Sequence, residues 1–146
     1  MRFHLIDRID DYEPSTRVRG RKLVSAAEPG LRDTAAGPVL EAPLVLEALC
    51  QAGTWLIMLS TERRKRAALL QIGSVELLGV ARPGDEVVLD GVVESMSDEM
   101  AVLSGTATVG GVLIMRATDI MCALIDAGDL ADDADSVRLL EGLVRS

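Results

Sequence analysis

Residues 43–60, PLVLEALCQAGTWLIMLS, form the most apolar stretch of the chain and constrain its fold more than any other feature. Pro43 suits the first turn of a helix, where its missing N–H costs no hydrogen bond. We expect the helix to run to about Arg64, where the basic run RRKR complements its negative C-terminal end. A helix that is apolar nearly all round cannot leave one side in water, so a curved sheet or a second subunit must cover it.

Two polar residues, Glu47 and Gln51, interrupt this stretch one helical turn apart. The stretch is shorter than the ~20 apolar residues of a membrane-spanning helix. If the stretch did span a membrane, the charge of Glu47 inside the bilayer would also cost several kcal/mol. We therefore predict a buried helix in a protein that does not use a membrane, and the two polar groups call for a specific explanation.

The composition narrows the class of protein further. The 146 residues suit one domain, and with only 2% aromatic residues the core must be mainly aliphatic. Fifteen basic against twenty-three acidic residues give a net charge of −8, which argues against a nucleic acid partner. Cys50 and Cys122 lie in apolar segments and no secretory signal is evident, so we expect reduced thiols and a cytoplasmic location. No metal-ligand spacing and no phosphate-binding loop is found, so neither a metal nor a cofactor is expected.

Most of the remaining sequence is typical of strands. We expect strands at residues 6–12, 16–25, 67–74, 75–80, 86–97, 100–109 and 112–124. Gly110-Gly111 predicts a tight hairpin turn, because both residues can adopt positive φ. Residues 26–42 are rich in glycine and proline, so regular structure is not expected there. We divide the chain into a domain at residues 1–125 and an acidic linker with a last helix at residues 126–146, capped by Ser136.

One long apolar helix followed by antiparallel strands implies the α+β class. The geometry that covers such a helix is a hotdog fold, in which a curved antiparallel sheet wraps around a long central helix. We expect this fold to be dimeric.

Several short motifs resemble those of the β-hydroxyacyl-acyl-carrier-protein dehydratases, a hotdog family. The matching strings are LIDRID at residues 5–10, AEP at 27–29, EALCQAG at 47–53, RPGDEV at 82–87 and ATDIMCA at 117–123. They keep the family's order and spacing over nearly the whole chain except the acidic tail. The resemblance implies an acyl thioester, on an acyl carrier protein or coenzyme A, as the substrate in fatty acid or polyketide metabolism. It also implies a homodimer or a higher even oligomer.

The resemblance places the family's catalytic glutamate at Glu47, with Gln51 orienting it. The family pairs this glutamate with a loop histidine of the other subunit, but Thr34 stands at the histidine's position. Asp33, one residue away, is a candidate substitute base, although a loop aspartate more often caps a turn. The only histidine, His4, lies at the N-terminus, where a structural or surface role is the simpler interpretation.

Substrate contacts are expected at Ala42, Leu44 and Gly37. The first N–H groups of the helix point out of its start and can polarise a thioester carbonyl, as the family does with the glycine at the Ala42 position. A carrier protein would meet few basic residues before the PGD motif, where Arg82 is the only one. Two other basic segments, residues 17–21 and 63–66, are alternative docking surfaces or simply solvated faces.

Three functions remain open. The resemblance implies 3-hydroxyacyl dehydration, but a threonine hydroxyl is no general base unless something activates it, so His-dependent dehydration is not expected. An acyl thioesterase that uses Glu47 is the first alternative. The second is a non-catalytic hotdog subunit, which either pairs with a histidine-bearing homologue or has a closed tunnel.

Overall fold

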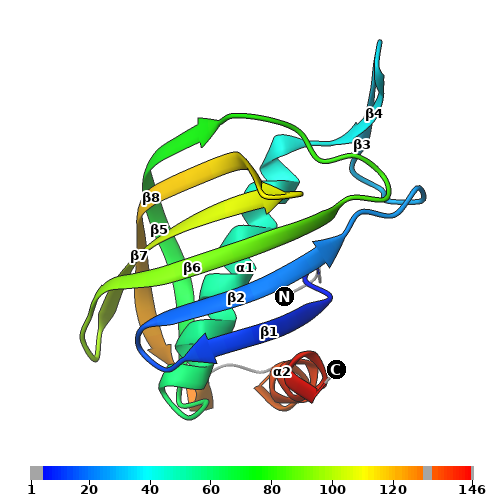
Figure 1. Ribbon diagram of the computed structural model, residues 1–146. Helices are drawn as coiled ribbons and strands as arrows, with labels where there is room; N and C mark the ends of the chain where they lie inside the picture. The colour runs from blue at the N-terminus through cyan, green and yellow to red at the C-terminus, as the bar shows by residue number, and fades with distance from the viewer. Residues whose placement is uncertain (1–4, 130–132, 146) are drawn as a thin grey trace.

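The computed structural model describes residues 5–129 and 133–145, and it confirms the hotdog architecture. A six-stranded antiparallel sheet curves around the long helix α1 (Ala42–Ser60), as Figure 1 shows. The strands follow the spatial order β1-β2-β6-β7-β8-β5. Their bounds are β1 (Arg8–Glu13), β2 (Arg17–Leu23), β5 (Lys65–Leu77), β6 (Glu86–Met96), β7 (Met100–Val109) and β8 (Val112–Asp126).

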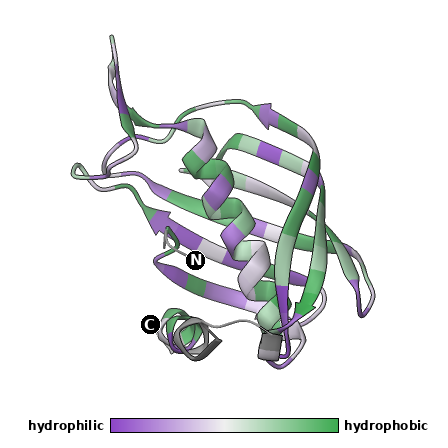
Figure 2. Ribbon diagram, turned by 180° about the vertical axis from the view of Figure 1, so that it is seen from behind, coloured by the Kyte–Doolittle hydropathy of each residue, from purple (hydrophilic) through white to green (hydrophobic). Residues whose placement is uncertain are grey.

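The inner face of the sheet and one side of α1 form the hydrophobic core. Trp55, Leu56 and Ile57 of the helix are at most 1% exposed, and they belong to one cluster with the inward-facing residues of the strands. No strand covers the opposite side of α1, which faces the viewer in Figure 2. By length and composition α1 could span a membrane, but half of its apolar window is buried inside the protein, as expected for a core helix.

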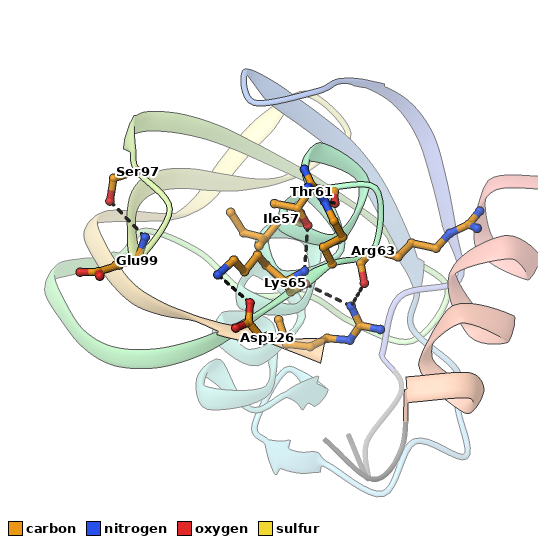
Figure 3. Close-up of polar contacts among 9 residues, drawn as sticks. Ile57, Thr61, Arg63, Lys65, Ser97, Glu99 and Asp126 are labelled. Atoms are coloured by element: carbon orange, nitrogen blue, oxygen red, sulfur yellow. Dashed lines mark hydrogen bonds and ion pairs between the residues drawn. The ribbon is translucent and has the colours of Figure 1, made fainter. Parts of the chain in front are cut away.

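The C-terminal end of α1 comes earlier than the predicted Arg64. The helix ends at Ser60, because Glu62 and Arg63 turn the backbone into the left-handed region with φ of 53° and 69°. The Thr61 hydroxyl donates to the Ile57 carbonyl (2.9 Å) and accepts the N–H of Lys65 (3.1 Å), which joins the helix end to the start of β5 (Figure 3).

The basic run after α1 is largely occupied by contacts within the chain. Lys65 forms an ion pair with Asp126 (2.8 Å, Figure 3), and Arg63 contacts Glu141 (3.5 Å). Strand β2 behaves in the same way, because its outward-facing arginines pair with carboxylates of β1 and β6. Both basic segments therefore form ion pairs within the chain, which the sequence analysis did not predict.

Residues 65–77 form one continuous strand, where the sequence predicted two. This strand, β5, pairs with β8 on one side only and forms an edge of the sheet. Its partner β8 contains a bulge, in which two residues lie opposite one residue of β7 and Asp119 has a φ of 53°.

A small hairpin lies in the segment for which no regular structure was expected. Strands β3 (Leu31–Thr34) and β4 (Gly37–Leu40) pair only with each other, and in Figure 1 the hairpin projects from the domain before α1 begins. Two backbone hydrogen bonds fix its base, from Leu40 to the Ala81 carbonyl (2.8 Å) and from Glu41 to the Gly30 carbonyl (3.0 Å). The expectation of an irregular segment was wrong because these long-range bonds outweigh the local effect of glycine and proline.

The predicted Gly110-Gly111 turn is confirmed. Both residues have positive φ, 57° and 79°, as a two-residue hairpin between β7 and β8 requires.

The last helix, α2 (Asp133–Arg145), begins three residues before Ser136, so the predicted cap is wrong. Its Leu140 and Leu143 are 1% and 4% exposed and belong to the main core cluster. The short 3-10 helix η1 (Ala127–Asp129) precedes it. The sequence suggested a division of the chain at residue 126. In the structure, α2 packs into the same hydrophobic core as the residues before that point.

Candidate active site

Glu47 lies on the side of α1 that no strand covers. Its side chain is exposed, whereas Gln51, one turn further, is 2% exposed. The Gln51 amide nitrogen donates to a Glu47 carboxylate oxygen at 3.3 Å. The apolar helix therefore tolerates its glutamate because that residue reaches solvent, and its glutamine because both ends of the amide form hydrogen bonds.

The orientation of the Gln51 amide is determined by the N-terminal segment. The backbone N–H of Leu5 donates to Gln51 Oε1 at 3.0 Å. Since a backbone N–H is only a donor, the oxygen of the amide must face Leu5 and its NH2 group must face Glu47. Gln51 thus presents a donor to the carboxylate. The sequence could not reveal this link, because its two ends are 46 residues apart.

The start of α1 offers fewer N–H groups than the sequence suggested. Leu44 and Val45 both donate to the Glu41 carbonyl, at 2.9 and 3.3 Å, so they are used within the first turn. Pro43 has no N–H. Among the described residues the Ala42 N–H has no acceptor. Ala42 therefore remains a candidate donor to a carbonyl, whereas the predicted Leu44 donor does not.

A groove of about 330 Å³ opens beside Ala42. Its walls come from β3, β4, the first turn of α1, the end of β5 with the residues just after it, and the start of β8. The lining is apolar except for Arg32, and consists of Arg32, Val39, Leu40, Ala42, Val45, Leu77, Gly79, Val80, Ile114 and Met115. The sequence alone could not reveal this groove, because its residues come from five separate segments.

Thr34, at the family histidine's position, closes the tip of the β3–β4 hairpin. Its hydroxyl donates to the Gly37 carbonyl at 2.6 Å, and Gly37 has a φ of 111°, in the region that favours glycine. Neither Thr34 nor the exposed Asp33 bonds to Glu47 in the described part of one protomer. Within a protomer Thr34 and Gly37 are thus turn-forming residues. His4 lies outside the described residues.

A buried ion pair supports the segment that leads into the hairpin. Lys22 Nζ and Glu28 Oε1 are 2.6 Å apart, with side chains only 6% and 11% exposed. Glu28 is the central residue of the AEP motif, and its carboxylate also accepts the N–H of Ser25 (3.4 Å). The motif match identified Glu28 but did not explain why a glutamate stands at this position. The reason is structural, since the pair fixes the loop between β2 and β3.

Cys50 and Cys122 line a small apolar cavity of about 30 Å³ between α1 and the sheet. Burial, with smaller contributions from Glu47 and Cys122, raises the pKa of the Cys50 thiol to about 11. Burial also raises the pKa of Cys122. Both residues are free thiols, as expected, and at neutral pH a protonated thiol is a poor nucleophile. The Cys50 thiol is therefore a poor attacking group at neutral pH, although it lies one turn from Glu47.

The thiol of Cys50 is expected to react slowly with iodoacetamide at neutral pH. With a pKa of about 11, only about one thiol in a thousand is ionised at pH 8, and the rate should rise about tenfold per pH unit until pH reaches about 11. Mass spectrometry of timed samples would measure this rate, with a Cys122→Ser variant isolating Cys50. A rate that levels off near pH 8.5 would contradict the buried environment described here.

An antiparallel sheet wrapped around one long helix defines a hotdog protein, and this one carries a carboxylate on the helix and a groove at the helix start. No family model matches the sequence. The 3-hydroxyacyl-[acyl-carrier-protein] dehydratase FabZ of Chloroflexus aggregans is 34% identical over 126 residues, which are 85% of this chain and 87% of that protein. FabZ of Roseiflexus sp. (strain RS-1) is also 34% identical, over 86% of this chain and 89% of that protein. The chain belongs to the FabZ-type dehydratase family.

Solved structures independently support the fold. The protein smu.793 from Streptococcus mutans UA159, bound to acetyl CoA, matches with a TM-score of 0.68 and 18% identity over 85% of this chain and 91% of that one. A hypothetical thioesterase from Streptococcus pneumoniae TIGR4, with coenzyme A, has a TM-score of 0.63 and 18% identity over 82% and 85% of the two chains. At this identity the likeness concerns the fold alone.

Proposed function

We propose that this protein binds acyl thioesters, carried by an acyl carrier protein or coenzyme A, in fatty acid or polyketide metabolism. The observation that carries the proposal is the Glu47–Gln51 pair, which keeps the family's glutamate exposed and oriented on the open side of α1. The Ala42 N–H beside an apolar groove supplies a candidate donor for the thioester carbonyl. We place the protein in the cytoplasm, as for a soluble enzyme of this family.

The protein acts as a homodimer or a higher even oligomer in this proposal. Strand β5 is a long edge strand with unpaired backbone groups on one side, and its Leu69, Val75 and Leu77 are exposed. Exposed apolar edges of this length are pairing sites in proteins that assemble through their sheets. A second copy at this edge would also cover the open side of α1, which satisfies the requirement of an apolar helix.

His-dependent dehydration is not part of the proposal. A general base must accept a proton near the working pH, and no imidazole stands at residue 34. The Thr34 hydroxyl is engaged with the Gly37 carbonyl, which supports a structural role at the hairpin tip. Asp33 forms no contact with a described residue that would position it as a base.

Thioester hydrolysis is the second candidate function. It needs a carboxylate that can either attack the thioester carbonyl or activate a water molecule. The exposed, oriented Glu47 is suited to either role. The alternative of a non-catalytic subunit would use the same residue differently, with Glu47 donated to a histidine-bearing homologue. Co-purification with such a homologue would favour hetero-pairing, whereas turnover by the isolated homodimer would rule it out.

A substrate panel tests these functions directly. The purified protein is offered 3-hydroxyacyl and saturated acyl thioesters of several lengths. Enoyl formation would support dehydration and release of free thiol would support hydrolysis. If no thioester of the panel binds or turns over, the acyl-thioester function itself is refuted.

Restoring the histidine is expected to change the reaction. In Thr34→His the imidazole would stand at the family's position, and dehydration of 3-hydroxyacyl thioesters should rise about 100-fold, the usual contribution of a positioned general base. Enoyl absorbance measures the gain, and Thr34→Ala is the control because it removes the hydroxyl without adding a base. Equal rates in both variants would show that residue 34 does not reach the reacting atoms.

A further inference from the structure

Arg32 differs in its surroundings from the other arginines of residues 5–129. Each of the others in residues 5–129 contacts a carboxylate or a backbone carbonyl. These contacts involve Arg8, Arg17, Arg19, Arg21, Arg63, Arg64, Arg66, Arg82 and Arg116. The exposed Arg32 side chain forms no ion pair and no hydrogen bond with any described residue.

This unpaired cation lies at the groove beside the start of α1. Arg32 is opposite Val39 in the β3–β4 hairpin, and both line the groove, which has apolar walls and a volume of about 330 Å³. No described acidic side chain lines the groove, so its only charge is positive. Backbone hydrogen bonds hold the base of the hairpin, and Arg82 donates to the Ala36 carbonyl at its tip (3.3 Å). The backbone that carries Arg32 is therefore held in place at both ends of the hairpin.

An apolar groove with one guanidinium suits a long ligand that is mostly uncharged and carries one anionic group. A guanidinium binds phosphate through two parallel hydrogen bonds, which makes arginine the usual residue for this recognition. Both acyl carriers present their thioester at the end of a 4′-phosphopantetheine arm. The first charged group along this arm, counted from the sulfur, is a phosphate.

We propose that Arg32 binds the phosphate of the 4′-phosphopantetheine arm, with the uncharged part of the arm lying in the apolar groove. The inference rests on the proposed acyl-thioester function and adds the group that recognises the carrier side of the substrate. Arg32 is accordingly a binding residue. It selects thioesters that carry the phosphate, from either coenzyme A or a carrier protein, over thioesters of pantetheine alone.

The test compares four non-hydrolysable thioethers that differ only beyond the sulfur. S-hexyl-pantetheine lacks the phosphate, S-hexyl-4′-phosphopantetheine has it, and S-hexyl-coenzyme A and an S-hexyl carrier protein supply it from the two natural sources. Calorimetry gives the Kd of each for the wild-type protein, Arg32→Ala and the control Arg17→Ala, whose arginine is paired with Asp11 on the outer face. Light scattering confirms that the variants keep the wild-type oligomeric state.

We expect the wild-type protein to bind S-hexyl-4′-phosphopantetheine roughly 10- to 100-fold more tightly than S-hexyl-pantetheine, as for a charge-assisted pair. Arg32→Ala should lose this preference while its Kd for S-hexyl-pantetheine stays unchanged, and Arg17→Ala should behave as wild type. The loss should appear with coenzyme A, the carrier protein or both, which identifies the source of the arm.

Other results would overturn the proposal. Equal weakening of all four ligands in Arg32→Ala, or a changed oligomeric state, would assign Arg32 to the subunit contact. A loss confined to coenzyme A and absent from S-hexyl-4′-phosphopantetheine would assign it to the nucleotide. Binding with no preference for the phosphate would refute this inference alone, whereas binding of none of the four would refute the proposed function as well.

Discussion

Replacing Glu47 with glutamine is expected to lower acyl-thioester turnover by about 100-fold or more, because an amide can neither accept a proton nor attack a carbonyl. The side chain is exposed in the protomer and its only described hydrogen-bond partner is Gln51, so folding should be little affected. Initial rates on the best substrate of the panel, with the thermal midpoint of each variant, measure both effects.

Glu41→Gln provides the matched control for this change. Glu41 is also exposed, lies directly before α1, and forms no side-chain cap bond, so the same substitution there should leave the rate near that of the wild type. Unchanged turnover in Glu47→Gln would show that Glu47 takes no part in the reaction. Loss of turnover in both variants would indicate a general effect of charge at the helix start.

The double substitution Val75→Lys and Leu77→Lys is expected to separate the subunits. Both residues lie on the unpaired edge strand β5 and are 38% and 61% exposed in the protomer, so the protomer tolerates lysine at both positions. In a dimer built on this edge the new charges would be buried without partners or would repel each other, which costs several kcal/mol. We expect a monomer at micromolar concentration, measured by light scattering. Turnover should also fall, partly because Leu77 lines the groove beside Ala42.

Val112→Lys is the control for this variant. Val112 is 66% exposed at the tip of the β7–β8 hairpin and is not part of the β5 edge, so lysine there should change neither assembly nor activity. If the double variant remains a dimer, the subunit interface does not lie at the β5 edge. A monomer with full activity would show that the site is complete within one chain.

The hotdog fold could be predicted from sequence because its two main determinants are local. The apolar run at residues 43–60 can only be a covered helix, and alternating segments after it can only pair as a sheet. The Gly110-Gly111 turn was equally predictable, since positive φ at two successive positions is a local property that glycine provides. The family motifs added the identity of Glu47.

The errors in the prediction arose where distant segments meet. Residues 31–40 form a hairpin although glycine and proline disfavour regular structure, because backbone bonds to Gly30 and Ala81 hold its base. One strand was divided into two at Ser74, since the pairing with β8 that keeps it continuous is not visible in its own residues. The predicted N–H donor of Leu44 is occupied by Glu41, a detail of the first turn that composition does not specify.

Some features of the candidate site could likewise be predicted from the sequence, whereas others depend on the tertiary structure. The sequence alone determined that a glutamate and a glutamine share one face of an apolar helix, and that no histidine stands at residue 34, because both facts are matters of spacing and identity. Only the tertiary structure decided that Leu5 orients the Gln51 amide toward Glu47 and that Arg32 is an unpaired cation at an apolar groove. The physical reason is that hydrogen-bond direction and pairing of charges depend on which distant groups come within about 3 Å, and this is fixed only when the sheet closes around the helix.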